Sequence, residues 1–234
     1  MSGGKTIQRA QVEALVREAL RRYLVEVAPG SSVLAPAAAP GAPRLIANIS
    51  ARHCHLNQRA MDILFGPGSQ LKPLKPLYQA GAFAAEQTVT VFGPRQQMIA
   101  NLRILGPQRD DCQVELAFTD ARFLGIEAPI RLSGDIEGTP GCFLVGPAGG
   151  LELSHGVIRA ARHAHMSPAE AQHYGVKQGD RMRLVVEGEQ GGRLDDILVR
   201  VGPDLKLEVH VDTDEGNAVD LVNATSVRLE KMDS

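Results

Sequence analysis

The stretch Ser50-Ala51-Arg52-His53-Cys54-His55-Leu56-Asn57 returns as Ala160-Ala161-Arg162-His163-Ala164-His165-Met166-Ser167, and both copies share the core Arg-His-x-His. Four of the seven histidines lie in these two copies. Successive side chains of an extended segment alternate between faces, so each copy places two imidazoles on one side. Two such imidazoles are typical ligands of a divalent metal such as zinc, whereas polar strand residues without a metal are the structural alternative. The repeat therefore predicts two related units, each with a metal-ligand pair.

Length and composition limit the class of protein. A chain of 234 residues forms one large or two small domains, and the duplication favours two of about 80 to 110 residues. The net charge of -2 leaves no basic footprint for nucleic acid. We find neither a signal peptide nor an apolar run near the ~20 residues of a membrane span. The three cysteines form no paired framework, so we expect reduced thiols in a soluble intracellular protein, with Cys54 buried on the face opposite the histidines.

The N-terminal segment differs from the rest of the chain. Residues 1–27 contain apolar side chains at helical spacing from Thr6 to Val27, which predicts an amphipathic helix. Residues 28–43 are Ala, Pro, Gly or Ser except for Val33 and Leu34, which predicts a flexible linker. The apolar face of the helix must be buried on its own protein, in an oligomer, or in a groove of another protein.

From Arg44 onward the sequence is typical of a mainly β protein built from small barrels. Short β-prone runs are divided by Gly and Pro at 45–49, 88–92, 99–105, 113–118, 130–132, 181–186, 196–201 and 207–211. Only two short helices are expected, one after each His-x-His. The first follows the cap Asn57, and the second follows Ser167, with Pro168 and Glu170 completing a capping box.

A third ligand for each metal follows from a longer similarity between the halves. The segment 102–107 resembles 199–203, and each is followed by a strand in which Glu115 corresponds to His210. The predicted ligand sets are His53, His55 and Glu115 for one metal, and His163, His165 and His210 for the other. Three protein ligands leave a coordination position open, as in catalytic zinc sites. A solvated strand residue is the alternative for Glu115.

Several motifs together resemble the phosphate propanoyltransferases, the PduL-type phosphotransacylases of bacterial microcompartments. The motifs are Ser50-Ala51-Arg52-His53-x-His55-Leu56, Arg103-x-Leu105-Gly106-Pro107-x-Arg109-x-x-x-Gln113-Val114-Glu115, Thr119-Asp120-Ala121-Arg122 and Ala160-x-Arg162-His163-x-His165-Met166. The resemblance covers about residues 45–223. Cys54 and Ala164 stand where bulkier aliphatic residues are common in the family, a difference in packing that affects no ligand.

This resemblance implies an enzyme of two tandem β-barrels with short capping helices, which interconverts an acyl-CoA plus phosphate with an acyl phosphate plus CoA. The barrels would comprise residues 44–51 with 161–234, and residues 52–160. Two metal ions would be held by the six residues named above, and the phosphate-handling arginine falls on Arg109. The CoA contacts fall on Ser50, Lys75, Arg103, Leu105 and Asn217, with Lys72 an alternative to Lys75.

The same resemblance bears on location and partners. The N-terminal helix and linker are similar to the family's encapsulation peptides, which favours docking on a microcompartment shell or core protein. The expected location is then the lumen of a microcompartment in the bacterial cytoplasm, for example in propanediol degradation. A homo-oligomer remains an alternative. The ligand types accept zinc, cobalt, nickel or iron, and zinc is the metal we expect.

The predicted chemistry is direct attack of a phosphate oxygen on the thioester of propanoyl-CoA or acetyl-CoA, because no Ser or Cys has the signature of an activated nucleophile. The metal at His53, His55 and Glu115 would hold the CoA sulfur, and the second metal would attract phosphate. The rival hypotheses are a metal-dependent hydrolase or oxygenase and a non-catalytic metal-binding assembly module. The alternation of helices that a (β/α)8 amidohydrolase needs is missing, and a cupin-type Glu would lie closer to the His pair.

Overall fold

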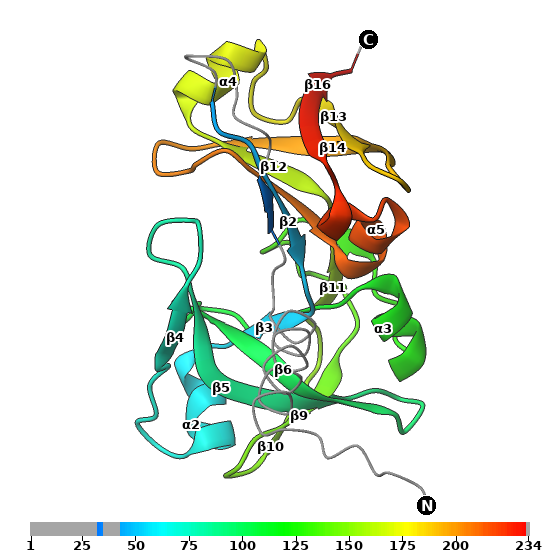
Figure 1. Cartoon of the computed structure of the whole chain (residues 1–234). Coiled ribbons are helices and arrows are strands. Elements are labelled where there is room, and N and C mark those ends of the chain that lie inside the picture. The colour runs from blue at the N-terminus through cyan, green and yellow to red at the C-terminus, as the bar shows by residue number, and fades with distance from the viewer. Residues whose placement is uncertain (1–31, 35–42, 233–234) are drawn as a thin grey trace, which may run out of the picture.

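The computed structural model describes residues 32–34 and 43–232, so the predicted N-terminal helix and most of the linker lie outside the described residues. The described part is mainly β, with two curled sheets and short helices at their margins (Figure 1). The expected fold class, two small barrels with short helices, is thereby confirmed. None of the described helices is long and apolar enough to cross a membrane.

The first sheet has seven strands. In spatial order they are β1 (Ser32–Leu34), β2 (Ile46–Ser50), β15 (Glu208–Asp212), β12 (His163–Met166), β14 (Gly192–Val201), β13 (Arg181–Glu187) and β16 (Ser226–Lys231). The helices α4 (Pro168–Tyr174) and α5 (Thr213–Ala218) and the 3-10 turn η1 (Leu221–Asn223) belong to the same half of the chain. Its core is one apolar cluster that includes Ala47, Met166, Met182 and Leu221.

The second sheet has nine strands. Eight follow the order β10 (Gly150–Leu153), β9 (Cys142–Val145), β5 (Phe83–Phe92), β6 (Met98–Gly106), β3 (His53–His55), β7 (Gln113–Glu115), β11 (Val157–Ala160) and β8 (Ile130–Arg131), while β4 (Pro73–Pro76) pairs with β5. The helices α2 (Gln58–Phe65) and α3 (Phe118–Leu124) lie beside it. Its separate core includes Cys54, Leu56 and Leu102, and Cys54 is fully buried there as expected.

The chain crosses between the two sheets at both copies of the repeat. Strand β2 of the first sheet is followed directly by β3 of the second, and β11 of the second is followed directly by β12 of the first. The connecting residues are Ala51 and Arg52 in one copy, and Ala161 and Arg162 in the other. Each His-x-His therefore begins where the chain enters a new sheet, which places both copies at the junction. On this topology we propose domains of residues 44–51 with 161–234, and of residues 52–160.

Two details of the secondary structure differ from the expectation. Besides α2 and α4, the described residues form α3, α5 and η1, so the prediction of only two helices was wrong. Helix α5 carries a readable signal, because Asp212 and Glu215 form a capping box, whereas α3 has no side-chain cap. Within the segment predicted as a linker, Ser32–Leu34 pairs antiparallel with β2 as an edge strand. This strand contains Val33 and Leu34, the two apolar exceptions in that segment.

Candidate active site

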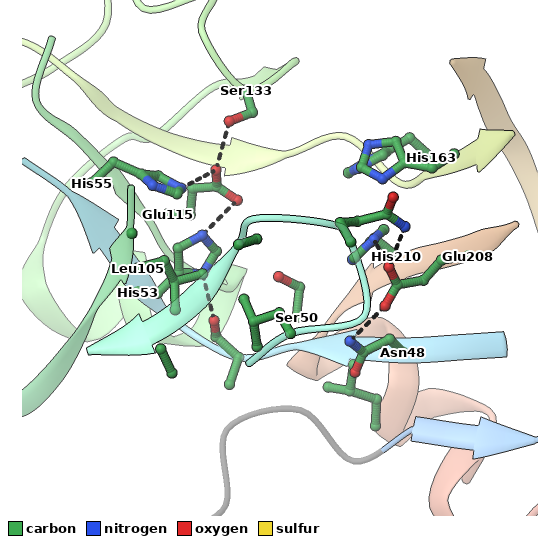
Figure 2. A pocket seen from close by; sticks show the side chains of 18 of the residues that line it. Asn48, Ser50, His53, His55, Leu105, Glu115, Ser133, His163, Glu208 and His210 are labelled. Atoms are coloured by element: carbon green, nitrogen blue, oxygen red, sulfur yellow. Dashed lines mark hydrogen bonds and ion pairs between the residues drawn. The ribbon is translucent and has the colours of Figure 1, made fainter. Parts of the chain in front are cut away.

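Both predicted ligand sets face one cavity of about 280 Å³ at the junction of the sheets (Figure 2). Its lining includes all six predicted metal ligands, together with Ser50, Leu105, Arg109 and several polar residues that the sequence did not single out. The apolar part of the wall includes Leu77, Ala82 and Ala84. A cavity that joins apolar walls to a few convergent polar groups is typical of a small-molecule site.

The first cluster is built on two paired strands. Strand β3 runs antiparallel to β7, and His53 stands directly opposite Glu115. The Nε2 atom of His53 lies 3.5 Å from Glu115 Oε2, and the Nε2 atom of His55 lies 3.9 Å from Glu115 Oε1. All three residues are buried. The Nδ1–H of His53 donates to the carbonyl of Ala51 at 2.8 Å, so that the other ring nitrogen, Nε2, faces the carboxylate.

The second cluster repeats this backbone arrangement with a different third residue. Strand β12 runs antiparallel to β15, and His163 stands opposite His210. The rings of His163 and His210 stack with centroids 4.9 Å apart, and His165 lies 5.0 Å from His210. The Nδ1–H of His163 donates to the carbonyl of Ala161 at 2.8 Å, as His53 does in the first copy. The two copies therefore fix the same tautomer in their first histidine.

The geometry of both clusters fits a divalent metal. The ligand atoms of each set of three lie within 4.8 Å of one another. Two ligands bound tetrahedrally to one zinc at ~2.0 Å would be about 3.3 Å apart, close to the separations around Glu115. A hydrogen bond from the opposite ring nitrogen to a carbonyl is the usual support of a metal-ligating histidine. Nitrogen donors with one carboxylate suit zinc and its neighbours among the transition metals.

The charge state of the rings agrees with this use. Burial and the adjacent His53 lower the pKa of His55 to about 3. Burial and the adjacent His210 lower the pKa of His163 to about 4 and that of His165 to about 3. These three rings are neutral near pH 7, which is the form that binds a metal.

His53 differs because it faces a carboxylate. Burial of its ring favours the neutral form, but the neighbouring Glu115 charge and hydrogen bond, helped by the Ala51 carbonyl, raise its pKa overall. The reverse holds for Glu115, whose burial is outweighed by His53, His55 and Ser133, so that its pKa lies well below the ordinary value. Each of the two groups therefore favours the charged form of the other.

Arg109 is connected to Glu115 through Ser133. Its guanidinium donates to Ser133 Oγ at 2.9 Å, and Ser133 Oγ–H donates to Glu115 Oε1 at 3.0 Å. Gln113 Nε2 donates to the same carboxylate oxygen at 2.5 Å. Burial, together with the neighbouring Arg200, lowers the pKa of Arg109, although Glu115 opposes this. A planar guanidinium held in this way is suited to binding two oxygens of a phosphate.

The residues expected to contact CoA divide into two groups. Ser50 and Leu105 line the cavity. Lys75, Arg103 and Asn217 are not among its lining residues, although Lys75 lies on β4, two residues before the lining residue Leu77. Arg103 donates to the carbonyls of Ala85 at 2.9 Å and Glu86 at 2.8 Å, which ties β6 to β5. These five contacts stay predictions.

Several polar residues beside the ligands were missed from the sequence. Gln113 and Glu208 lie two positions before Glu115 and His210, so the alternation of strand side chains could have indicated them. Ser133 and Gln79 lie in connections between strands, where no local pattern shows what a side chain will reach. Glu208 accepts from Asn48 Nδ2 at 3.1 Å and from Gln79 Nε2 at 2.6 Å, and the contact with Asn48 is drawn in Figure 2.

Comparison with known proteins identifies the class of enzyme. The sequence profile of the family "Phosphate propanoyltransferase" matches residues 46–222. A phosphate propanoyltransferase of Planctopirus limnophila is 54% identical over 226 residues, which cover 96% of this chain and 92% of that protein. The protein of the same name from Thermotoga maritima is 49% identical over 75% of this chain and 84% of its own length. That of Rhodopseudomonas palustris is 40% identical over 95% of this chain and 98% of its own length.

The fold, the cavity and these matches define an acyltransferase that uses phosphate. The chain belongs to the phosphate propanoyltransferase family. Acyl-CoA and inorganic phosphate are substrates that fit this family, and CoA is the corresponding product.

Proposed function

We propose that this chain interconverts propanoyl-CoA or acetyl-CoA plus phosphate with the acyl phosphate plus CoA, in the cavity lined by the two His-x-His clusters. The observation that carries the proposal is the position of Arg109 beside Glu115, joined to it through Ser133 on the wall of the same cavity. An anion-binding guanidinium next to metal-type ligands is the arrangement that phosphate attack on an acyl group needs.

In the proposed reaction a phosphate oxygen attacks the thioester carbonyl carbon directly. The new carbon–oxygen bond forms as the carbon–sulfur bond breaks, and the proton of hydrogen phosphate passes to the departing CoA sulfur. Arg109 orients the phosphate, and the apolar wall at Leu77, Ala82 and Ala84 excludes water from the acyl group. Two observations support direct attack without a cysteine nucleophile: none of the three cysteines is among the lining residues of the cavity, and burial raises the pKa of the Cys54, Cys112 and Cys142 thiols.

Two divalent metal ions, of which zinc is our choice, would be held by His53, His55 and Glu115, and by His163, His165 and His210. When bound, they would supply Lewis-acid stabilisation of negative charge on oxygen and sulfur. Arg109 is the proposed catalytic residue. Ser50, Lys75, Arg103, Leu105 and Asn217 are the proposed CoA contacts.

We further propose that the protein works in a bacterial microcompartment, for example in propanediol degradation. The N-terminal segment 1–27 would dock on a shell or core protein, since its sequence predicts an amphipathic helix and is followed by an Ala/Pro-rich segment. Fusion of residues 1–43 to a fluorescent reporter tests this in compartment-forming cells. Punctate signal is expected, and diffuse signal would contradict docking.

Release of free thiol from propanoyl-CoA or acetyl-CoA tests the catalytic proposal. We expect release that requires inorganic phosphate, generates an acyl phosphate detectable as its hydroxamate, and stops when a chelator removes the metals. Thiol release without phosphate would instead indicate a hydrolase. Trapping of an acyl-enzyme by rapid quench and mass spectrometry would exclude direct attack.

A further inference from the structure

The two clusters can be compared position by position, because their strand pairs have the same register. In the first, His53 stands opposite Glu115 and His55 opposite Gln113. The corresponding pairs of the second cluster are His163 with His210, and His165 with Glu208. Each cluster thus has four matched positions, two on the His-x-His strand and two on its partner strand. The partner strand carries an amide and a carboxylate in the first cluster, and a carboxylate and an imidazole in the second.

Glu208 is the residue that this comparison singles out. It is only 2% exposed and lines the cavity at the position where the first cluster has Gln113. Its Oε2 atom lies 3.1 Å from His210 Nε2. That nitrogen is buried and has no aligned hydrogen-bond partner among the described residues. A buried carboxylate is retained at such a site only when it is paired or binds a cation.

The surroundings of Glu208 hold its carboxylate toward the second cluster. Asn48 Nδ2 donates to Oε1 at 3.1 Å, and Gln79 Nε2 donates to Oε2 at 2.6 Å. Gln79 lies in the β4–β5 connection of the other sheet and is held by the backbone of Lys206. Its Oε1 accepts from the Lys206 N–H at 3.2 Å, and its Nε2 donates to the Lys206 carbonyl at 3.1 Å. One donor lies on strand β2 and the other in the β4–β5 connection, so the orientation of the Glu208 carboxylate is fixed from two sides.

We infer that Glu208 is the carboxylate of the second metal cluster, the counterpart of Glu115 in the first. The inference rests on the proposed two-metal function and names a further residue of the same site. Each cluster then contains one negative charge for its divalent ion. In the first cluster this charge is on Glu115, opposite the first histidine of the pair, and in the second it is on Glu208, opposite the second histidine. The second ion would not be held by three neutral imidazoles alone.

The test measures metal affinity instead of activity. The test uses the full-length chain with His53→Ala, which removes one ligand of the first cluster. Of the two clusters, only the second then keeps all of its ligands. In that background, Glu208→Gln is expected to weaken Zn²⁺ binding by about 10- to 100-fold, the usual range for residues that support metal ligands. Competition with a chromophoric chelator gives the affinity, and the visible absorption of the Co²⁺-loaded protein reports a changed ligand field. Glu189→Gln, on the exposed 188–191 turn of the same half, is the matched control and is expected to change neither.

A charge-swap variant separates charge supply from structural support. Glu208→Gln combined with His210→Glu gives the second cluster the Gln and Glu order of the first. It is expected to recover Zn²⁺ affinity to within about 10-fold of the parent, and it also decides the matter if the single variant does not fold. Unchanged affinity in Glu208→Gln, or no recovery in the swap variant, would overturn the inference. Failure of the wild-type chain to bind two ions would instead refute the proposed two-metal function.

Discussion

The two clusters share a backbone plan but differ in access to solvent. His53, His55 and Glu115 are 6%, 6% and 8% exposed, whereas the three histidines of the second cluster are half-buried. In the first, a carboxylate stands among the ligands themselves, and in the second the carboxylate of Glu208 stands behind His210. The two copies therefore share the strand register and differ in the two side chains of the partner strand, which are Gln113 and Glu115 in the first cluster and Glu208 and His210 in the second. We expect a tightly held ion at the first cluster and a more accessible one at the second.

Removal of the metals should have the largest effect and should separate the clusters. Because a catalytic metal contributes several kcal/mol, a strong chelator is expected to lower phosphate-dependent thiol release by about 1000-fold or more. The ion of the more exposed second cluster should leave first. Elemental analysis of samples taken along the inactivation gives the order of release. Recovery on adding Zn²⁺ controls for unfolding, and simultaneous loss of both ions would contradict the difference in access.

Replacement of Arg109 by Ala tests whether phosphate binds beside the first cluster, where Arg109 is joined to Glu115 through Ser133. Loss of a charged hydrogen-bond donor typically costs ~1.5 to 3 kcal/mol, so we expect about a 10- to 150-fold loss of kcat/KM for phosphate, with the KM for acyl-CoA little changed. Initial rates at varied phosphate concentration measure this. Arg193→Ala, an exposed arginine on β14, serves as control. A change below about threefold would mean that Arg109 does not bind phosphate.

Replacement of Ser133 by Ala should have a smaller effect in the same direction. This hydroxyl accepts from Arg109 and donates to Glu115, so its loss frees the guanidinium and removes one donor to the carboxylate. We expect about a three- to tenfold rise in the KM for phosphate, since a single hydrogen bond contributes ~1 kcal/mol. Steady-state kinetics at varied phosphate concentration measure this effect, and Ser154→Ala, at an exposed serine, is the control. An effect confined to the KM for acyl-CoA would place Ser133 on the thioester side.

The repeat allowed much of the site to be predicted, because it constrains pairing as well as composition. Glu115 lies 60 positions beyond His55, yet its correspondence to His210 predicted that it would join the first cluster, and the strands do place it opposite His53. Both clusters face one cavity because the chain changes sheets at each copy. This second fact depends on connections that strand patterns do not encode.

The rest of the site depends on contacts between elements far apart in the chain. Gln79 reaches Glu208 from a connection on the other sheet, 129 positions earlier, and nothing in its own neighbourhood indicates this contact. Ser133 reaches Glu115 in the same way. Helix α3 was not predicted, because its sequence lacks a side-chain cap, and the predicted strand 113–118 overlaps it only at Phe118. The capping box of α5 was visible in the sequence and overlooked. Local signals and long-range packing are independent sources of information.

The acid stability of the metal-free protein should differ between the clusters. The pKa values of His163 and His165 are lowered by burial to about 4 and about 3, so the unfolded chain binds protons below pH 6.5 that the folded chain excludes. Stability contributed by these rings therefore falls as the pH decreases from 6.5 toward 4. His53 has a raised pKa, so its protonation is stabilising below pH 6.5 and that contribution is lost as the pH rises through the folded value.

Urea unfolding of chelator-treated protein between pH 7 and 4.5 measures this difference. His163→Gln is expected to flatten the loss of stability on acidification, by about 1 to 3 kcal/mol at the acid end, and His53→Gln is expected to steepen it. A carboxylate with a lowered pKa also makes stability fall on acidification, but only near and below pH 4.5. Glu208, with a folded pKa of about 2, is an example, because it becomes protonated in the unfolded chain at a higher pH than in the folded chain. Equal slopes in the two variants would mean that the clusters respond alike to protons.

The arginines of the two Arg-His-x-His copies should differ least, and only in stability. Arg162 Nε donates to Glu215 Oε1 at 2.9 Å and its Nη1 donates to the Asp195 carbonyl at 3.0 Å, and its side chain is 30% exposed. Among the described residues, Arg52 donates to Asp120 Oδ1 at 3.0 Å, and 48% of its side chain is exposed.

Arg162→Ala is therefore expected to lower the free energy of unfolding by about 1 to 2 kcal/mol, and Arg52→Ala by less than about 1 kcal/mol. The larger loss arises because Arg162 donates to a backbone carbonyl of β14 and also to Glu215. The other carboxylate oxygen of Glu215 accepts from the backbone N–H of Asp212 at 3.0 Å in the cap of α5. High salt should reduce the Arg52 effect further, since an exposed ion pair is screened. Urea denaturation at low and high salt measures both variants. Equal losses would show that the second copy gains nothing from its link to α5, and that the two crossings between the sheets are equivalent mechanically even though their clusters differ chemically.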